Sequence, residues 1–392
     1  MDASRQGSIK LLATLARRSS WVIVATLCAV LAFAMTVFSQ AANAHWPGQP
    51  EHQFAELGKL MLESGEVIKN FRMSYVTHGK LSAAKDNAIL FHHGFAANHH
   101  LFDHMIGPGR PLDTDKYFII CPDTLGATQT GYERTTSATS SGMKMKFPFF
   151  NGRDIVNASR RLVTETLGVP RLLMMTGISS GAADSLQFAV SHPNSVAAIV
   201  PIVGGVVPGP QRRFYPPMAA SIIRSCQSWD EGNYDAISGQ CATNAVSQWA
   251  HHFYTRQWWD AYAQTPEAYN KWRSSFGEYY LDIQDARDLY YRIVAFGRSS
   301  VGDTPGFGGE LAKALGSIKA KTLFIYNVQD EIFPSHHVEA EVKMTPHARA
   351  VAIDSIGGHL ICCNADPNAT RLMGDAIRTF LQDLVLLRMG AK

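Results

Sequence analysis

The sequence lacks the features that define several large classes of protein. Its 392 residues contain no internal repeat of solenoid or propeller length and no low-complexity segment, which excludes repeat and disordered architectures. It also lacks Cys-x-x-Cys motifs and the cysteine–histidine spacings of zinc sites. With 46% hydrophobic and 18% charged residues, the chain has the composition of a globular protein with a substantial core.

The N-terminal 44 residues have the pattern of an export signal. Arg17 and Arg18 precede Trp21–Phe38, an apolar run without charge, and Ala42-Asn43-Ala44 forms the small-x-small pattern of a signal peptidase site. We therefore expect residues 1–44 to be removed and the mature protein to be secreted or periplasmic. The alternative is a retained anchor, because a run of this length can just span a bilayer.

The mature chain has no excess of either charge. The full sequence has 36 basic and 33 acidic residues, of which four basic and one acidic leave with residues 1–44. The 32 of each sign that remain give no electrostatic footprint for nucleic acid or for an anionic membrane. We therefore expect neither nucleic-acid binding nor stable membrane association after the signal is removed.

Five cysteines remain after Cys28 leaves with the signal: Cys121, Cys226, Cys241, Cys362 and Cys363. An odd number leaves at least one thiol free or bonded between chains. Export permits disulfides, and Cys226 and Cys241 are the favoured pair because they are close in sequence. The adjacent Cys362 and Cys363 would form a strained vicinal disulfide, or else remain two thiols near the active site.

Short apolar runs alternate with helical patterns, which favours a mostly parallel sheet with crossover helices. The predicted strands are Ala88–Phe91, Tyr117–Cys121, Leu172–Thr176, Ala197–Ile202, Thr322–Tyr326 and Ala350–Ile353. The predicted helices are Asp154–Leu167, Ala182–Ser191 and Arg371–Leu386. Two earlier runs, Gly65–Ile68 and Met73–Thr77, predict an opening hairpin.

The alternation stops between residues 207 and 314, which we interpret as a helical lid inserted between two parts of one core, 45–206 and 315–392. Four prolines punctuate its start, and it holds five of the seven tryptophans: Trp229, Trp249, Trp258, Trp259 and Trp272. These aromatic residues either line an apolar acyl pocket or form the core of the lid itself. The lid also offers a surface for a homodimer.

A serine nucleophile is predicted at Ser179. The motif Gly177-Ile178-Ser179-Ser180-Gly181 follows a predicted strand and precedes a predicted helix. Glycines flank such a serine because the turn is too tight for side chains, and its strained backbone directs the hydroxyl into a cleft. Ser180 is the competing serine in the same turn.

A serine hydroxyl needs a base, which an acid orients. Asp330 follows the strand Thr322–Tyr326, and His359 follows the strand Ala350–Ile353. Both positions lie at the carboxyl edge of a parallel sheet, where catalytic loops gather. We predict a Ser179–His359–Asp330 triad. Competing acids are Glu331, Asp303 and Asp354.

The loop after Ala88–Phe91 reads His92-His93-Gly94-Phe95. In sheets with such a serine turn, this loop donates one backbone N–H to the oxyanion hole and the residue after the nucleophile donates the other. We assign these roles to Phe95 and Ser180. No carboxylate or cysteine completes a ligand set at suitable spacing beside the nearby histidines (His92, His93, His99, His100 and His104), so we predict no metal and no cofactor.

These residues resemble the homoserine O-acetyltransferase-like branch of the α/β-hydrolase superfamily. The matching segments are Leu62-Glu63-Ser64-Gly65, Ile106-Gly107-Pro108-Gly109, Leu112–Phe118, Phe147-Pro148, Arg153-Asp154-Ile155-Val156, Asp330 with Phe333-Pro334, and Asp354-Ser355 with His359. The resemblance implies an α/β-hydrolase fold: a mostly parallel central sheet, helices on both faces and a helical lid inserted late in the sheet. It covers about residues 55–205 and 315–385.

The sequence departs from that family at two places. The elbow reads Gly-Ile-Ser-Ser-Gly-Ala where the family usually has Gly-Gly-Ser-Met-Gly-Gly, and Ala220 occupies the apparent position of the lid arginine that holds the acceptor carboxylate, with Arg224 one turn away. Export would also deprive the enzyme of acetyl-CoA. We therefore expect an exported serine hydrolase acting on a small or polymeric ester or amide. The alternatives are an acyl-CoA-dependent O-acyltransferase and a non-catalytic binding protein on this scaffold.

Overall fold

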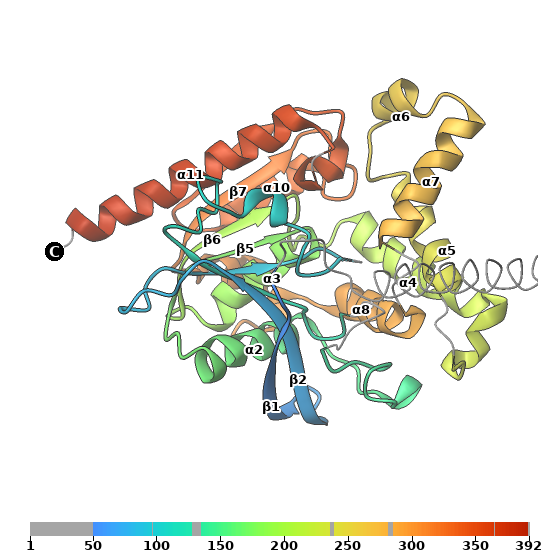
Figure 1. Cartoon of the computed structure of the whole chain (residues 1–392), viewed down its shortest axis with the longest axis horizontal. Helices are drawn as coiled ribbons and strands as arrows, with labels where there is room; N and C mark the ends of the chain where they lie inside the picture. Colours follow the sequence, from blue (N-terminus) through green and yellow to red (C-terminus); the bar gives the residue numbers. More distant parts are fainter. Residues whose placement is uncertain are drawn as a thin grey trace, which may run out of the picture. The chain divides into compact units, whose positions relative to one another are not determined.

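An eight-stranded, mostly parallel sheet forms the centre of the protein (Figure 1). The computed structural model describes residues 50–95, 97–127, 135–235, 239–280, 285–363 and 365–390, so the predicted signal 1–44 lies outside the described residues. The strand order is β1-β2-β4-β3-β5-β6-β7-β8, with β2 antiparallel to both of its neighbours and every other pair parallel. The strands are β1 Gln53–Met61, β2 Val67–His78, β3 Ala88–His92, β4 Phe118–Pro122, β5 Leu172–Ile178, β6 Val196–Ile202, β7 Lys321–Asn327 and β8 Ala348–Ile353.

The inner strands are apolar throughout because both faces of the sheet are covered. Along β3, Ala88 and Leu90 belong to one hydrophobic cluster, whereas Ile89 and Phe91 belong to a second cluster on the other face. The first cluster includes residues of α2 Gly152–Arg161 and α3 Ser180–Ser191, and the second includes residues of α11 Pro367–Gly390. The predicted α/β-hydrolase architecture is confirmed, with helices on both faces.

The first predicted crossover helix starts earlier than expected. Asn151 is the N-cap of α2: its side chain accepts hydrogen bonds from the N–H groups of Arg153 and Asp154, while the Asp154 carboxylate accepts one from the Asn151 N–H. Asp154 is therefore the N3 residue of a capping box, and Asn151 is the N-cap residue. The segment ends in the π-helical turn Leu162–Thr166.

The predicted opening hairpin is wrong in its pairing. Met73–Thr77 lies inside β2, and Gly65–Ile68 covers the turn before β2 and its first residues. The true partner of β2 is β1. More than half of the residues of β1 are exposed, and its pairing register with β2 shifts around Gly58. A half-exposed edge strand with polar and glycine residues has too few apolar positions to stand out in the sequence.

The predicted lid is helical in all of its described secondary structure, and its helices gather on the right of Figure 1. The helices between β6 and β7 are α4 Pro210–Ser225, α5 Gly239–Ala250, α6 Arg256–Tyr262, α7 Pro266–Tyr280, α8 Ala286–Arg298 and α9 Leu311–Gly316; α10 Ser335–Met344 follows β7. Residues of α4, α5 and α8 share a separate hydrophobic cluster around Ile223, Trp229 and Ile293. The exact limits 207 and 314 stay predictions.

The lid carries a disulfide. Cys226, at the end of α4, is bonded to Cys241 in α5, with 5.6 Å between the Cα atoms, which confirms the predicted pair. Cys121, Cys362 and Cys363 are free thiols. Among the residues described, no helix combines the length and apolarity that a bilayer span requires.

Candidate active site

Ser179 occupies a strained turn between β5 and α3. Its φ of 58° and ψ of −115° lie in a region that residues other than glycine rarely adopt. The turn needs its glycines, because a Cβ on Gly177 would lie 2.1 Å from the Gly181 carbonyl oxygen, and one on Gly181 would lie 2.3 Å from the His92 carbonyl oxygen. The predicted strand–Ser179–helix context is therefore present.

The three residues predicted as a triad meet at the carboxyl edge of the sheet. The Nε2 atom of His359 lies 2.9 Å from the Oγ atom of Ser179, and its Nδ1 atom lies 2.8 Å from the Oδ2 atom of Asp330. His359 and Asp330 are 4% and 5% exposed. An ionised carboxylate at Nδ1 fixes the tautomer that leaves Nε2 free to accept the serine proton.

Asp330 is held by its own loop. Its Oδ1 atom accepts hydrogen bonds from the N–H groups of Ile332 and Phe333, at 2.8 and 3.0 Å. Of the competing acids, Glu331 pairs with His252 at 3.0 Å and Asp354 accepts from Gln329, so neither is the His359 partner.

Asn327, which sequence reasoning missed, fixes the loop that carries His359. It is the last residue of β7 and fully buried. Its amide nitrogen donates to the carbonyl oxygens of Ser355 and Gly358, at 2.8 and 2.7 Å, and its Oδ1 atom accepts from the Ser355 N–H at 3.1 Å. The only signal for this role in the sequence is an asparagine directly after the predicted apolar strand Thr322–Tyr326.

The predicted oxyanion loop is anchored by two buried histidines. His92 contacts Asp184 of α3 through Nδ1, at 3.0 Å, and Ser159 of α2 through Nε2, at 2.9 Å. The next residue, His93, accepts a hydrogen bond at Nε2 from the Thr124 N–H, at 3.3 Å. These contacts tie the loop to both neighbouring helices and to the end of β4.

His93 is a neutral imidazole. Burial, together with the charge of Arg292, lowers the pKa of His93 to about 3. Because its Nε2 atom accepts from Thr124, its proton lies on Nδ1, which donates to the Gly94 carbonyl oxygen at 2.8 Å. That bond holds the peptide next to Phe95, whose N–H is the predicted oxyanion donor.

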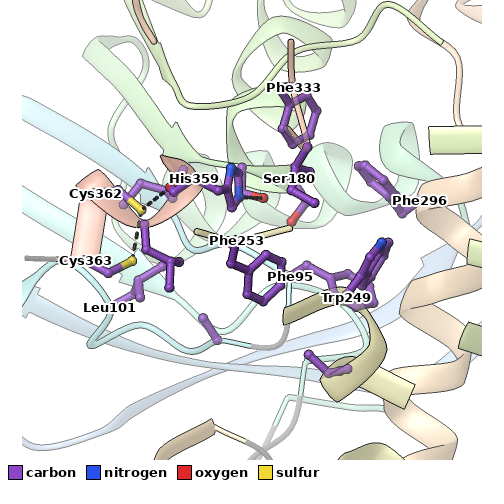
Figure 2. Close-up of a pocket in the computed structure, with 17 residues that line it drawn as sticks. Phe95, Leu101, Ser180, Trp249, Phe253, Phe296, Phe333, His359, Cys362 and Cys363 are labelled. Atoms are coloured by element: carbon purple, nitrogen blue, oxygen red, sulfur yellow. Dashed lines mark hydrogen bonds between the residues drawn. The ribbon is translucent and has the colours of Figure 1, made fainter. Parts of the chain in front are cut away.

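Ser179 and His359 open onto a cavity of about 80 Å³ (Figure 2). Phe95 and Ser180, the predicted oxyanion residues, also line it. In Figure 2, Cys362, Cys363 and Leu101 lie on one side of His359, and Phe296 and Trp249 lie on the other. The two sulfurs are 2.9 Å apart, and the cysteines are free thiols, which agrees with the second of the two sequence interpretations.

The structure divides the lid tryptophans between the two roles left open by the sequence. Trp249 lines the cavity and meets the Phe95 ring edge-to-face, with 5.1 Å between centroids. Trp229 packs in the hydrophobic cluster of the lid. The other three form an aromatic cluster with Tyr254 and Tyr269: Trp258, Trp259 and Trp272.

A second cavity of about 30 Å³ adjoins the first and shares Phe95, Ser180 and Phe296 with it. Two buried arginines line it, Arg212 of α4 and Arg292 of α8. Burial lowers the pKa of each arginine to about 10. Arg212 donates to the carbonyl oxygens of Gly205 and Ser299, at 3.2 and 2.9 Å.

From the sequence, we considered Ala220 and Arg224 for the lid arginine of the family and did not single out Arg212 or Arg292. Ala220 is buried in the lid cluster, and Arg224 is exposed and lines none of the cavities described. Arg212 and Arg292 stand beside the site because α4 and α8 pack together, a contact between segments far apart in the sequence.

Comparison with known proteins agrees with the fold. A family model for the alpha/beta hydrolase fold matches residues 87–365. A homoserine O-acetyltransferase of Deferribacter desulfuricans is 30% identical over 331 residues, which cover 76% of this chain and 87% of that protein. The chain therefore belongs to the α/β-hydrolase family. The same enzyme of Leptospira biflexa is 26% identical over 322 residues, covering 76% and 84%, so the predicted resemblance is confirmed.

Solved structures with the same fold include esterases. The acetyl esterase MekB has a TM-score of 0.78 at 25% identity and covers 85% of this chain and 97% of its own. An acetylester hydrolase from Corynebacterium glutamicum has a TM-score of 0.76 at 25% identity, covering 85% and 96%. A homoserine O-acetyltransferase from Bacillus anthracis has a TM-score of 0.76 at 23% identity, which shows the shared fold alone.

Proposed function

We propose that the protein cleaves short-chain carboxylic esters through an acyl-enzyme on Ser179. The observation that carries this proposal is the hydrogen-bonded series Ser179–His359–Asp330 at the wall of a small apolar cavity. The acetyl esterase MekB and the acetylester hydrolase from Corynebacterium glutamicum share this fold, which supports a short acyl group rather than a long chain.

The proposed reaction has two halves. His359 Nε2 takes the Ser179 proton while Oγ attacks the ester carbonyl, and the collapsing intermediate expels the alcohol, which leaves with that proton. Water then gives a proton to the same nitrogen and attacks the acyl-serine, releasing the acid and restoring the serine hydroxyl. The N–H groups of Phe95 and Ser180 hold the oxyanion in both halves, and the Asp330 carboxylate stabilises the imidazolium.

Covalent labelling tests the nucleophile. A fluorophosphonate probe should modify Ser179 alone, and Ser179→Ala should abolish both labelling and esterase activity. The matched control is Ser180→Ala, which should still be labelled. Labelling that persists in Ser179→Ala contradicts the assignment.

We also propose that the mature enzyme is exported. The support is the basic, apolar and small-residue order of residues 1–44. Intact-mass analysis of extracellular or periplasmic material should give His45 as the first residue. A product that keeps residues 1–44 in the membrane fraction supports the anchor, and a cytoplasmic product removes the export proposal.

Acetyl transfer to a hydroxyl acceptor is the second candidate function. It is favoured by the homoserine O-acetyltransferase relatives and by Arg212 and Arg292, whose guanidinium groups suit an acceptor carboxylate beside Ser180. The two functions share the acyl-enzyme and differ in whether water or the acceptor hydroxyl removes the acyl group.

Product analysis separates the two functions. We expect the mature protein to hydrolyse a short-chain aryl ester at a rate that homoserine does not change, and not to use acetyl-CoA as a donor. The assay contains acetyl-CoA and homoserine and quantifies both products. Stoichiometric O-acetylhomoserine with little free acetate would replace the esterase proposal by the transferase.

A further inference from the structure

Three histidines converge at the edge of the sheet, outside the triad. His52 precedes β1, and His99 and His100 lie in the loop after β3. One ring nitrogen from each lies within 4.8 Å of the others. The Nε2 atoms of His52 and His99 are 2.6 Å apart, and the His99 and His100 ring centroids are 4.2 Å apart.

Carboxylates contact the Nδ1 atoms of two of these rings and orient the rings. His99 Nδ1 lies 2.7 Å from Asp123 Oδ1, and His100 Nδ1 lies 2.8 Å from Asp103 Oδ2. A carboxylate only accepts, so each Nδ1 carries the proton and each Nε2 has a lone pair. This carboxylate–histidine arrangement is the one that fixes metal-binding imidazoles in proteins. Asp123 is itself fixed by the Ser74 hydroxyl, which donates to its Oδ2 atom at 2.6 Å.

Two of the three histidines are buried. His99 is fully buried and His100 is 7% exposed, while His52 is partly exposed and offers an entry path. Zinc–nitrogen bonds of about 2.0–2.1 Å place two tetrahedral ligands about 3.3 Å apart. The three nitrogens lie up to 4.8 Å apart, so zinc binding requires some of them to approach by as much as about 1.5 Å.

We propose that His52, His99 and His100 bind a transition-metal dication of the zinc type, with water at the fourth position. Neutral imidazoles are ligands for this class of ion, and the two carboxylates balance its charge. The sequence alone predicts no metal because His52 is 47 residues from His99, and neither carboxylate is recognisable as a partner before the strands are assembled.

The ion would act on the position of a loop. His99 and His100 belong to the same loop as Gly94 and Phe95, which line the active-site cavity. Binding to His52 ties this loop to the start of the β1–β2 hairpin. The expected effect is greater stability, so the test does not depend on turnover and is independent of the proposed esterase function.

Zinc binding to the full mature chain, prepared without a histidine tag and stripped with a chelator, tests this proposal. Calorimetric titration with Zn²⁺ should give one equivalent per chain, and the thermal midpoint should rise with zinc concentration. Co²⁺ in the same site should show the visible absorption of tetrahedral coordination.

Two variants assign the site. His52→Ala should weaken zinc binding at least tenfold, and because His52 is partly exposed this variant should fold. The matched control is His336→Ala/His337→Ala, a pair on α10 with 4.2 Å between ring centroids, which should bind zinc like the wild type. The proposal is overturned if the wild type does not bind one equivalent saturably, if His52→Ala binds equally well, or if only the control loses binding.

Discussion

The carboxylate of Asp330 lies 2.8 Å from His359 Nδ1, and its other oxygen accepts two backbone N–H groups. Asp330→Asn keeps the shape but presents an amide that favours the wrong imidazole tautomer. We expect kcat to fall by about 10³–10⁴-fold with little change in KM. Steady-state hydrolysis of a short aryl ester measures this. Glu331→Gln is the control and should keep nearly full activity. Equal losses in the two variants would contradict the assignment of Asp330.

Phe296 is one of three residues that line both cavities, and its ring is the largest apolar group among them apart from that of Phe95. Phe296→Ala should join them and admit longer acyl chains. We expect the ratio of kcat/KM for a hexanoyl ester to that for an acetyl ester to rise about tenfold or more, because each methylene in an apolar pocket contributes roughly 1–3 kcal/mol. Phe149→Ala removes a ring that is 38% exposed and lies outside both cavities, so its ratio should stay constant. An unchanged ratio in Phe296→Ala rejects this role.

Glu341 should make stability depend on pH. Burial raises its pKa to about 7, although the N–H groups of Val206 and Val207 and the charge of Arg212 oppose the shift. A raised native pKa means that the native state binds more protons than the unfolded state between pH 4.5 and 7. The stabilisation from Glu341 is therefore complete below pH 4.5 and is lost as the pH rises through 7. The free energy of unfolding should fall by about 3 kcal/mol over this range.

Urea denaturation across this range checks the sign for Glu341. In Glu341→Gln the side chain stays neutral, so its free energy of unfolding should lack that decline. Glu339→Gln, on the exposed side of the same helix, should keep the wild-type profile. The prediction is wrong if Glu341→Gln and the wild type have parallel profiles.

The lid disulfide should contribute measurably to stability. Its loop spans 15 positions, for which loop-closure entropy gives about 3 kcal/mol. The double variant Cys226→Ser/Cys241→Ser should lose that amount in urea denaturation. A reducing agent should destabilise the wild type similarly and leave the variant unchanged. If the reducing agent destabilises both proteins equally, the Cys226–Cys241 bond is not the source of the lost stability.

Local sequence signals predicted the parts of the fold and site that depend on neighbours in the chain. The strands from β3 to β8 were recognisable as apolar runs, and Ser179, Asp330 and His359 each follow one. Edge strand β1 was missed because its exposed positions carry polar residues. Asn327, Arg212 and Arg292 were missed because their roles arise from contacts between distant segments, which no local pattern encodes.

The tight approach of Gly177 and Gly181 to neighbouring carbonyls has a consequence for engineering new substrate ranges. A side chain at either glycine would collide with backbone, so the turn that carries the nucleophile cannot be reshaped one residue at a time. The cavity wall is different, because Phe253, Phe296 and Leu360 contribute side chains that smaller ones can replace. Libraries that vary the wall and spare the turn should therefore yield altered selectivity at a much higher frequency of folded clones.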